Sequence, residues 1–102
     1  MIARVWHGVT AAERADEYPD YLNETGVPDY RETEGNWGVY VLRRRIEGDR
    51  AHVLTVSLWG SIEEAKSFAG PDPEKARYYP EDEKFLLEFD PQVKHYDVVV
   101  GP

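Results

Sequence analysis

Two adjacent tyrosines in the second half of the chain, Tyr78 and Tyr79, are the residues best suited to chemistry. A phenolic O–H placed on a substrate oxygen would donate a hydrogen bond to a developing enolate or phenolate. Prolines on both sides favour an irregular segment that could close over a pocket. The alternative is that both rings cover a sheet edge and keep their hydroxyl groups in water.

Two histidines, His7 and His95, are the candidate general bases. An imidazole titrates close to neutral pH, with an unperturbed pKa of about 6.5. They lie on the first and last predicted strands, which we expect to be neighbours in the sheet. The alternative is that each is a hydrogen-bonded packing residue. His52 begins a predicted strand beside a turn, so we expect it to be solvated.

Large flat side chains are available to hold an aromatic ligand. We expect Trp6 and Trp59 to line a pocket, while packing in the core or at a subunit interface explains the tryptophans equally well. The basic run 43–45 is most simply the charged edge of a strand, which discourages aggregation.

Composition excludes several classes of partner and cofactor. The 20 acidic and 12 basic residues give a formal net charge of −8, which disfavours nucleic acid and anionic membranes. The chain has no cysteine, so it has no thiolate nucleophile or metal ligand. No zinc, calcium or phosphate-loop spacing occurs. We therefore expect no cofactor and no metal. Without a signal or membrane-spanning segment, we also expect a cytoplasmic protein.

The first half of the chain predicts a strand, a helix and a second strand. Residues 2–9 alternate as a strand that places Ile2, Arg4 and Trp6 on one face. Thr10 to Glu13 fits a capping box, which predicts that a helix begins there. We expect a kink or break near Pro19 and a helix end near Gly26. A short turn over 27–31 and a strand over 38–47 should follow.

The second half begins with a hairpin at 48–49 and a strand over 50–59 that is apolar on both faces. Ser61 to Glu64 is a second capping box, and the helix that it begins should end at Gly70. Residues 74–78 could form one or two helical turns, 85–87 is an apolar run of ambiguous type, and 93–100 is the last strand.

This β-α-β-β-α-β order predicts a single domain over residues 1–102. Its class is α+β: a ferredoxin-like antiparallel sheet with the third strand between the first two and helices on one face. The other face of the sheet would be apolar and uncovered, which is typical of an association surface. We therefore predict a homodimer through the helix-free sheet face.

The element order, the strand end Ser57-Leu58-Trp59, the capped helix after it and the segment ARYYPED at 76–82 together resemble the antibiotic biosynthesis monooxygenase family. That family consists of dimeric α+β barrel proteins. The resemblance implies a small-molecule pocket between sheet and helices, with Phe68 lining it and Arg77 binding substrate. It also implies cofactor-independent oxygenation of an activated phenol or enol, in which the protein deprotonates the substrate and the carbanion reacts with oxygen.

Two alternatives on the same scaffold stay open. One is a non-catalytic dimeric ligand-binding or stress-related protein, and the other is an isomerase or decarboxylase that needs no oxygen. A haem-degrading branch of the superfamily has an iron-ligating histidine after the second helix and an asparagine on the first strand. This chain has no histidine between His52 and His95 and no asparagine in residues 1–9, which argues against haem degradation.

Overall fold

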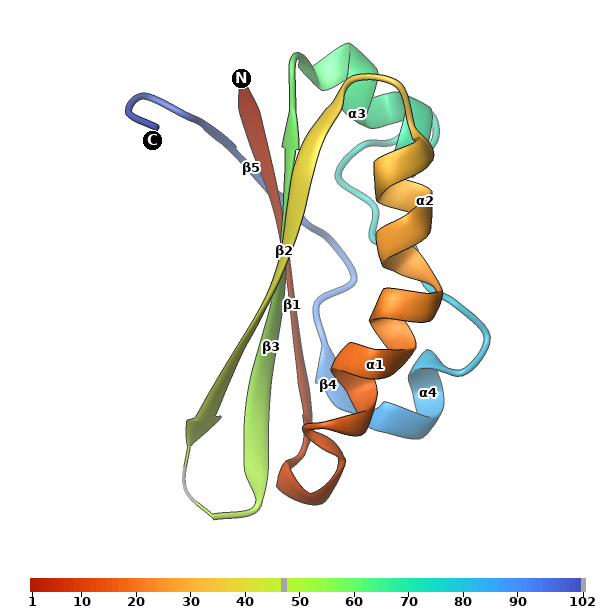
Figure 1. The fold of residues 1–102 in the computed structure, drawn as a ribbon, viewed down its shortest axis with the longest axis vertical. Helices are drawn as coiled ribbons and strands as arrows, with labels where there is room; N and C mark the ends of the chain where they lie inside the picture. The colour runs from red at the N-terminus through yellow and green to blue at the C-terminus, as the bar shows by residue number, and fades with distance from the viewer. Residues whose placement is uncertain (47, 102) are drawn as a thin grey trace.

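The computed structural model of the chain describes residues 1–46 and 48–101. Its elements follow the chain from a long first strand to two short last strands (Figure 1). They are β1 (Ile2–Ala11), the 3-10 helix η1 (Ala12–Arg14), α1 (Glu17–Glu24), α2 (Gly26–Glu32), β2 (Asn36–Ile46), β3 (Arg50–Trp59), α3 (Ile62–Ala69), α4 (Asp82–Phe85), β4 (Leu86–Phe89) and β5 (Lys94–Asp97).

The strands form one antiparallel sheet in the order β2-β3-β1-β4, with β5 also paired to β1. The second and third strands form a hairpin that places β3 between β1 and β2, as predicted. In the described part of the chain, α1, α2, α3 and α4 all lie on one side of the sheet, which leaves the opposite side free of helices (Figure 1). The predicted α+β, ferredoxin-like fold is confirmed.

The core lies between the sheet and the helices in two clusters of buried side chains. Alternation along β1 places Arg4 and Trp6 on the helix side, because successive strand residues point to opposite faces. One cluster contains Trp6, Tyr18, Leu22, Val53, Ala76 and Val93. The other contains Tyr30, Trp59, Ala65 and Phe68.

The predicted start of α3 is confirmed. The Ser61 side chain accepts a hydrogen bond from the Glu64 backbone N–H at 3.2 Å, and the helix begins at Ile62. Gly70 follows the last helical residue with a φ of 96°, a conformation that favours glycine. This helix holds Phe68 against the sheet, so a local sequence rule positions part of the core.

The predicted helix start at Thr10 is wrong. β1 continues through Ala11, which pairs with Arg50, and the Ala12 N–H donates to Asp49 O at 2.8 Å. These backbone bonds to β3 replace those of a first helical turn, and the helix begins only at Glu17. The long strand pairing therefore outweighs a local capping pattern.

The predicted kink at Pro19 is also wrong, because this proline lies in the first turn of α1, where its missing N–H has no helical partner to lose. The chain instead breaks at Thr25. In a continuous helix the ring of Pro28 would clash with the carbonyl of Glu24, which is the last residue of α1. Gly26 is thus the first residue of α2 and not a C-terminal cap.

The segment predicted to be helical at 74–78 is extended instead. Val93 N–H donates to Glu74 O at 2.7 Å, and Ala76 N–H donates to Pro91 O at 3.1 Å. Pairing with 91–93 uses the backbone groups that helical turns would need. The last strand is shorter than the predicted 93–100, while the ambiguous run at 85–87 ends α4 and begins β4. Glu47, the predicted end of the second strand, lies outside the described residues.

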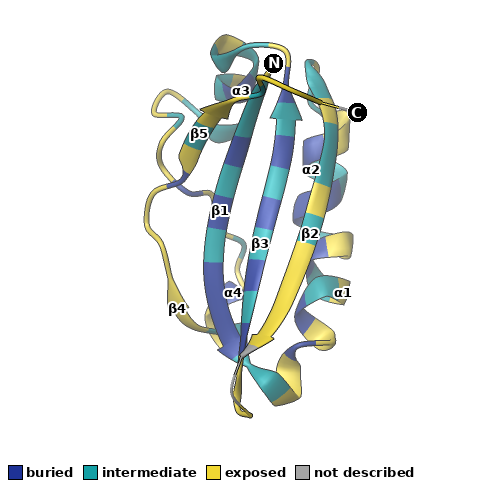
Figure 2. Ribbon diagram, turned by 90° about the vertical axis from the view of Figure 1, so that its left-hand side faces the viewer, coloured by how far each residue is buried: buried dark blue, intermediate teal, exposed yellow. Residues whose placement is uncertain are grey.

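Figure 2 shows the helix-free face of the sheet turned toward the viewer. We call it the open face. The cross-strand register places on it Ala3, Val5, Tyr40, Leu42, Leu54, Val56, Leu58 and Tyr96. Tyr40 is 58% exposed and Tyr96 is 52% exposed, so large apolar side chains lie in contact with solvent on this face.

Within residues 1–46 and 48–101, no helix combines the length and apolar character that a membrane span needs. The cytoplasmic location stays a prediction.

Candidate functional site

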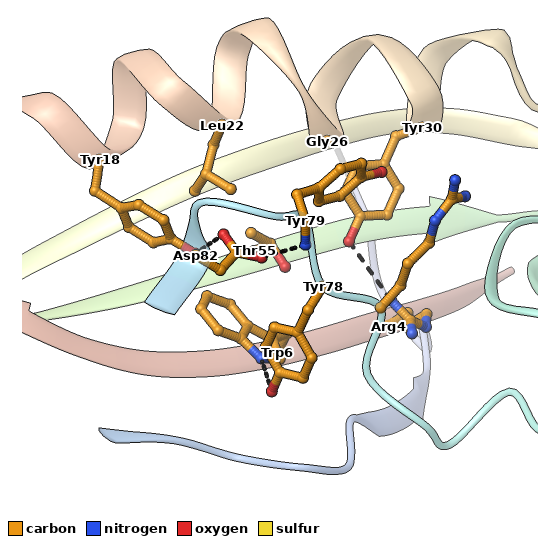
Figure 3. Close-up of a pocket in the computed structure, with 11 residues that line it drawn as sticks. Arg4, Trp6, Tyr18, Leu22, Gly26, Tyr30, Thr55, Tyr78, Tyr79 and Asp82 are labelled. Carbon is orange, nitrogen blue, oxygen red and sulfur yellow. Dashed lines mark hydrogen bonds between the residues drawn. The ribbon is translucent and has the colours of Figure 1, made fainter. Parts of the chain in front are cut away.

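A small pocket lies between α1, α2 and the sheet, and the segment that follows α3 closes one side of it (Figure 3). Its inner cavity has a volume of about 20 Å³, which is space for about one water molecule. Aromatic rings and groups able to hold a proton share its lining: Arg4, Trp6, Tyr18, Leu22, Gly26, Tyr30, Thr55, Arg77, Tyr78, Tyr79 and Asp82.

Asp82, the first residue of α4, is a buried carboxyl group in this lining and is 4% exposed. The Tyr18 hydroxyl donates to its Oδ1 at 3.0 Å, and the Tyr79 backbone N–H donates to its Oδ2 at 2.6 Å. Burial raises the pKa of Asp82, and the two hydrogen bonds oppose part of that rise. A carboxylate with a raised pKa in a pocket is suited to accept a proton from a ligand.

Arg4 lies on the other side of the pocket and is 2% exposed (Figure 3). Its guanidinium donates to Lys75 O at 3.0 Å and to the Tyr30 hydroxyl at 3.5 Å, and it lies 5.5 Å from the centre of the Phe68 ring. Among the described residues, no carboxylate forms an ion pair with it. Burial lowers the pKa of Arg4. Since buried charges are ordinarily paired, this cation favours an anionic group in the pocket.

Tyr78 connects the pocket to the edge of the sheet. Its hydroxyl accepts a hydrogen bond from the Trp6 indole N–H at 3.1 Å and donates to the Asp90 carbonyl oxygen at 2.5 Å. The two rings meet edge to face, with their centroids 6.2 Å apart. Burial raises the pKa of Tyr78, so this phenol is a hydrogen-bond donor at neutral pH.

Tyr79 forms a second polar group with Arg77 and Asp29. Its hydroxyl donates to Asp29 Oδ2 at 2.6 Å, and the Arg77 guanidinium lies 3.4 Å from the same oxygen. Arg77 also lies 5.5 Å from the centre of the Tyr79 ring. Two main causes raise the pKa of Tyr79: burial, which is the larger, and the hydrogen bond to Asp29. Tyr79 is therefore held as a neutral phenol.

A wider cleft of about 450 Å³ adjoins this pocket. Three residues line both spaces, Tyr78, Tyr79 and Asp82, and we call them the wall. The rest of the cleft is lined by Pro80, Glu83, Leu86 and Phe89. A cleft of this volume is in the range of small-molecule sites, which measure ~300–1,000 Å³.

The structure brings four of the predicted site residues together in one lining: Trp6, Arg77, Tyr78 and Tyr79. Trp59 and Phe68 lie in the core instead, with Trp59 fully buried and its indole N–H donating to Ser57 Oγ at 2.9 Å. The centroids of their two rings are 5.9 Å apart, and neither residue belongs to the lining of the pocket. Trp59 therefore supports the pocket from within the core.

The strands that carry His7 and His95 are neighbours, as expected, because β5 pairs with β1. The two side chains nevertheless lie on opposite faces: His95 is opposite Arg4 on the helix side, whereas His7 points to the open face. Burial and the nearby charge of Arg4 lower the pKa of His95, which keeps it neutral near pH 7. His52, expected to be solvated, is instead hydrogen-bonded to His7. Neither His7 nor His95 belongs to the lining of the pocket.

Sequence reasoning missed two of the three charged residues in the lining, Asp82 and Arg4. Asp82 belongs to the acidic run 81–83, which looks solvated in the sequence. Its burial depends on Tyr18, 64 positions away in the chain. Arg4 and Trp6 are two positions apart on a strand, which predicts that both lie on one face. No local signal shows that this face is the buried one.

Comparison with known proteins places this geometry in a fold family. No family model and no curated protein matches the chain. A Bacillus cereus protein described as a candidate antibiotic biosynthesis monooxygenase superimposes with a TM-score of 0.71 at 13% identity, over 99% of this chain and 95% of that one. The haem degrader MhuD of Mycobacterium tuberculosis, with two haems in its active site, gives 0.65 at 16% identity, over 100% and 99%.

A MhuD mutant with two manganese protoporphyrin IX molecules per active site also matches, with a TM-score of 0.62 at 16% identity over 100% of this chain and 98% of that one. The chain therefore has the fold of the antibiotic biosynthesis monooxygenases, as its sequence predicted.

Haem does not fit the pocket as it stands. The inner cavity of about 20 Å³ is far smaller than a haem site, and its lining contains no histidine. The hydroxyl groups of Tyr78 and Tyr79 are already hydrogen-bonded to Asp90 and Asp29. Across the described part of the chain, no three histidine, aspartate or glutamate side chains gather closely enough to hold a metal ion.

Proposed function

We propose that this protein binds a small aromatic molecule that bears an acidic hydroxyl group, an activated phenol or enol, and oxygenates it without a cofactor. One observation carries the proposal: the same pocket contains a buried guanidinium without an ion-pair partner among the described residues, Arg4, and a separate buried carboxyl group, Asp82. An acid that loses its proton to Asp82 becomes an anion, and Arg4 stabilises that anion.

The proposed reaction begins with proton transfer from the substrate to the Asp82 carboxylate. The electron-rich carbon of the phenolate then reacts with O₂ and forms a carbon–oxygen bond. The peroxide anion that results takes the proton back from Asp82. The hydroperoxide then loses water, with the hydrogen of the oxygenated carbon, and leaves a carbonyl group on the ring. One phenol and one O₂ therefore give one quinone and one water, and oxygen is the only oxidant.

Access to Arg4 requires a change in the wall formed by Tyr78, Tyr79 and Asp82. The inner cavity holds about one water molecule, whereas the outer cleft is large enough for a substituted ring. We place the ring of the ligand in the outer cleft and its acidic oxygen in the inner cavity after the tyrosine side chains turn aside. The hydrogen bond between Tyr78 and Trp6 is then exchanged for one to the ligand.

A second candidate function is non-catalytic ligand binding on the same scaffold, or an isomerase or decarboxylase that needs no oxygen. The small inner cavity favours the non-catalytic form, since Trp6, Tyr18, Leu22 and Tyr30 fill much of the space between helices and sheet. Oxygen consumption separates the first function from these alternatives.

The proposed biological unit is a homodimer through the open face. Three strands of ten or eleven residues give this face a length of about 33 Å and a width of about 14 Å, on the order of 500 Å² before side-chain relief is counted. This is a large part of the ~800 Å² per partner that a stable interface buries. A second copy offers the same apolar surface, and a two-fold axis closes the assembly.

We expect oxygen uptake when the purified protein meets one member of a panel of hydroquinones, naphthols and enolic diketones, with no flavin or metal added. One O₂ should be consumed per quinone formed, as an oxygen electrode and absorbance spectra can measure together. Binding of that phenol to the wild-type protein should also be tighter than binding of its methyl ether, which cannot become an anion. Equal affinity for both molecules would contradict the role of Arg4.

Arg4→Met should weaken binding of the same phenol about 10- to 100-fold, because a hydrogen bond to a charged group contributes about 1.5–3 kcal/mol. Calorimetric titration measures the loss. Arg31→Met, which removes an exposed guanidinium from α2, is the matched control and should bind as the wild type does. Circular dichroism shows whether Arg4→Met has kept its fold.

Tyr78→Phe and Tyr79→Phe should each slow turnover about tenfold or more while leaving the oligomeric state unchanged, because each removes a hydroxyl at the wall of the pocket. Steady-state rates with the substrate found above test this. Tyr21→Phe is the control, since its hydroxyl accepts the Glu81 backbone N–H outside the pocket lining. Wild-type rates in both variants would remove the tyrosines from the mechanism.

A further inference from the structure

A pair of histidines on the open face has no role in the proposed reaction. The His7 Nε2 and His52 Nδ1 atoms lie 2.7 Å apart, and the two rings stack with centroids 4.9 Å apart. The pair comes from the neighbouring strands β1 and β3, beside the apolar side chains Leu42 and Leu54. A hollow of about 300 Å³ lies over it, so the pair is at the surface on which we place a second copy of the chain.

One carboxylate lies within reach of the pair. The Asp90 Oδ2 atom is 3.5 Å from His7 Nδ1, the ring nitrogen that does not contact His52. A basic group lies on the other side of the pair: Arg44 is opposite His52 in the register of β2 and β3 and lines the same hollow. Arg43 also contributes to the lining, but its guanidinium bonds to Ala15 and Asp16 on the helix side of the sheet. Among the described residues, Arg50 and Glu88 also lie near this end of the open face and form an ion pair with each other. Lys94 lies opposite Val5 on β5.

The short contact between the two rings limits the number of protons that the pair can hold. A hydrogen bond between two imidazoles needs one N–H and one free lone pair, so at least one ring must be neutral. The first added proton suits the cluster: His7 then donates from Nδ1 to Asp90 and from Nε2 to His52. A second proton places an N–H on both facing nitrogens, breaks the contact and leaves two stacked cations beside Arg44.

We propose that the His7–His52 pair makes association through the open face dependent on pH, so that the dimer dissociates when the pair takes up its second proton. This inference rests on the proposed homodimer. The direction of this pH effect follows from desolvation. The charge of the first proton is neutralised by Asp90, whereas the second proton adds an unpaired charge to a surface that loses its water when the dimer forms. Acid supplies the second proton, so we expect the dimer to be tighter at pH 7.5 than at pH 5.0.

Sedimentation equilibrium of the full chain at pH 7.5 and pH 5.0 tests the inference. The dimer dissociation constant of the wild type should rise about tenfold or more at pH 5.0, while circular dichroism shows an unchanged fold. His52→Asn should dimerise at pH 7.5 and lose most of this pH dependence, because its amide oxygen can accept from His7 but cannot take a proton. His95→Asn, altered on the other side of the sheet, is the matched control and should keep the pH dependence.

Each result has a separate meaning. A wild-type dimer with the same dissociation constant at both pH values would overturn the pH dependence and leave the dimer intact. A His52→Asn dimer that responds to pH as strongly as the wild type would do the same. A monomer at pH 7.5 would overturn both the dimer and its pH dependence. Nitrogen-15 spectra of the wild-type rings add a check that needs no variant: a hydrogen bond between the imidazoles should be seen at pH 7.5 and be lost at pH 5.0. Its presence at both would contradict the proton count.

Discussion

Asp82→Asn is expected to lower the turnover rate at least 100-fold while the protein stays folded. A positioned general base contributes a factor of about 10²–10⁴, and asparagine cannot accept the substrate proton. The amide can still accept from the Tyr79 N–H and can donate to the Tyr18 oxygen, so both hydrogen-bond partners of Asp82 remain satisfied. Steady-state oxygen uptake with the substrate found in the panel measures the loss.

The same substitution carries a stability signature. Burial raises the folded-state pKa of Asp82 above the unfolded value, so the native state binds more protons between these two pKa values. The charged carboxylate therefore costs stability once the pH exceeds the folded pKa, and this cost fades as the pH falls. Asp82→Asn should be at least as stable as the wild type at pH 7, and catalytic activity of the wild type should fall as the pH drops through the raised pKa.

The exposed neighbour Glu81 provides the matched control. Glu81→Gln removes one negative charge at the adjacent position and should leave the rate unchanged. An Asp82→Asn protein that turns over at the wild-type rate would remove Asp82 from the reaction. If it unfolds more easily than the wild type at pH 7, then the ionised carboxylate stabilises the fold and the argument from burial is wrong.

Trp59→Ala is expected to lower the free energy of unfolding by about 3–5 kcal/mol, the usual cost of deleting a buried tryptophan side chain. Trp59 is fully buried, and its ring packs against Phe68 and Tyr30 at centroid distances of 5.9 Å and 6.4 Å. The change also leaves Ser57 Oγ without the indole N–H that it now accepts. Urea denaturation should show a lower midpoint with an unchanged slope.

Trp37→Ala is the control for the loss of stability in Trp59→Ala, because Trp37 is also a tryptophan but is 70% exposed on β2. A surface substitution of this kind changes stability by at most about 0.5 kcal/mol. A loss below about 1 kcal/mol in Trp59→Ala would mean that Trp59 does not hold the second cluster together. It would also return Trp59 to the list of ligand-binding candidates.

The fold was predictable because its signals are local or periodic. The Ser61 capping box, the 48–49 turn and the apolar run of strand 50–59 each depend on residues close together in the chain. The same kind of signal failed at Thr10, where a ten-residue pairing of β1 with β3 competes with one helical turn. A local rule holds where no long-range pairing uses the same backbone groups.

The site was predictable only in part, for a related reason. Tyr78 and Tyr79 were found because prolines mark their segment as irregular. Asp82 was not found, because its burial is created by Tyr18 on a helix far away in the chain. The distance between His7 and His95 depends on the register of β5 against β1, and no pattern in either strand fixes that register.

β1 has one further consequence, which concerns insertions and deletions. On one side this strand carries Arg4 and Trp6 into the pocket, and on the other it carries Val5 and His7 onto the open face. Adding or removing a single residue would turn every later side chain of the strand to the opposite side. Most substitutions in β1 change one surface, whereas inserting or deleting an odd number of residues exchanges the two unless a bulge absorbs the change. A β1 that keeps both surfaces can therefore vary in sequence far more freely than in length.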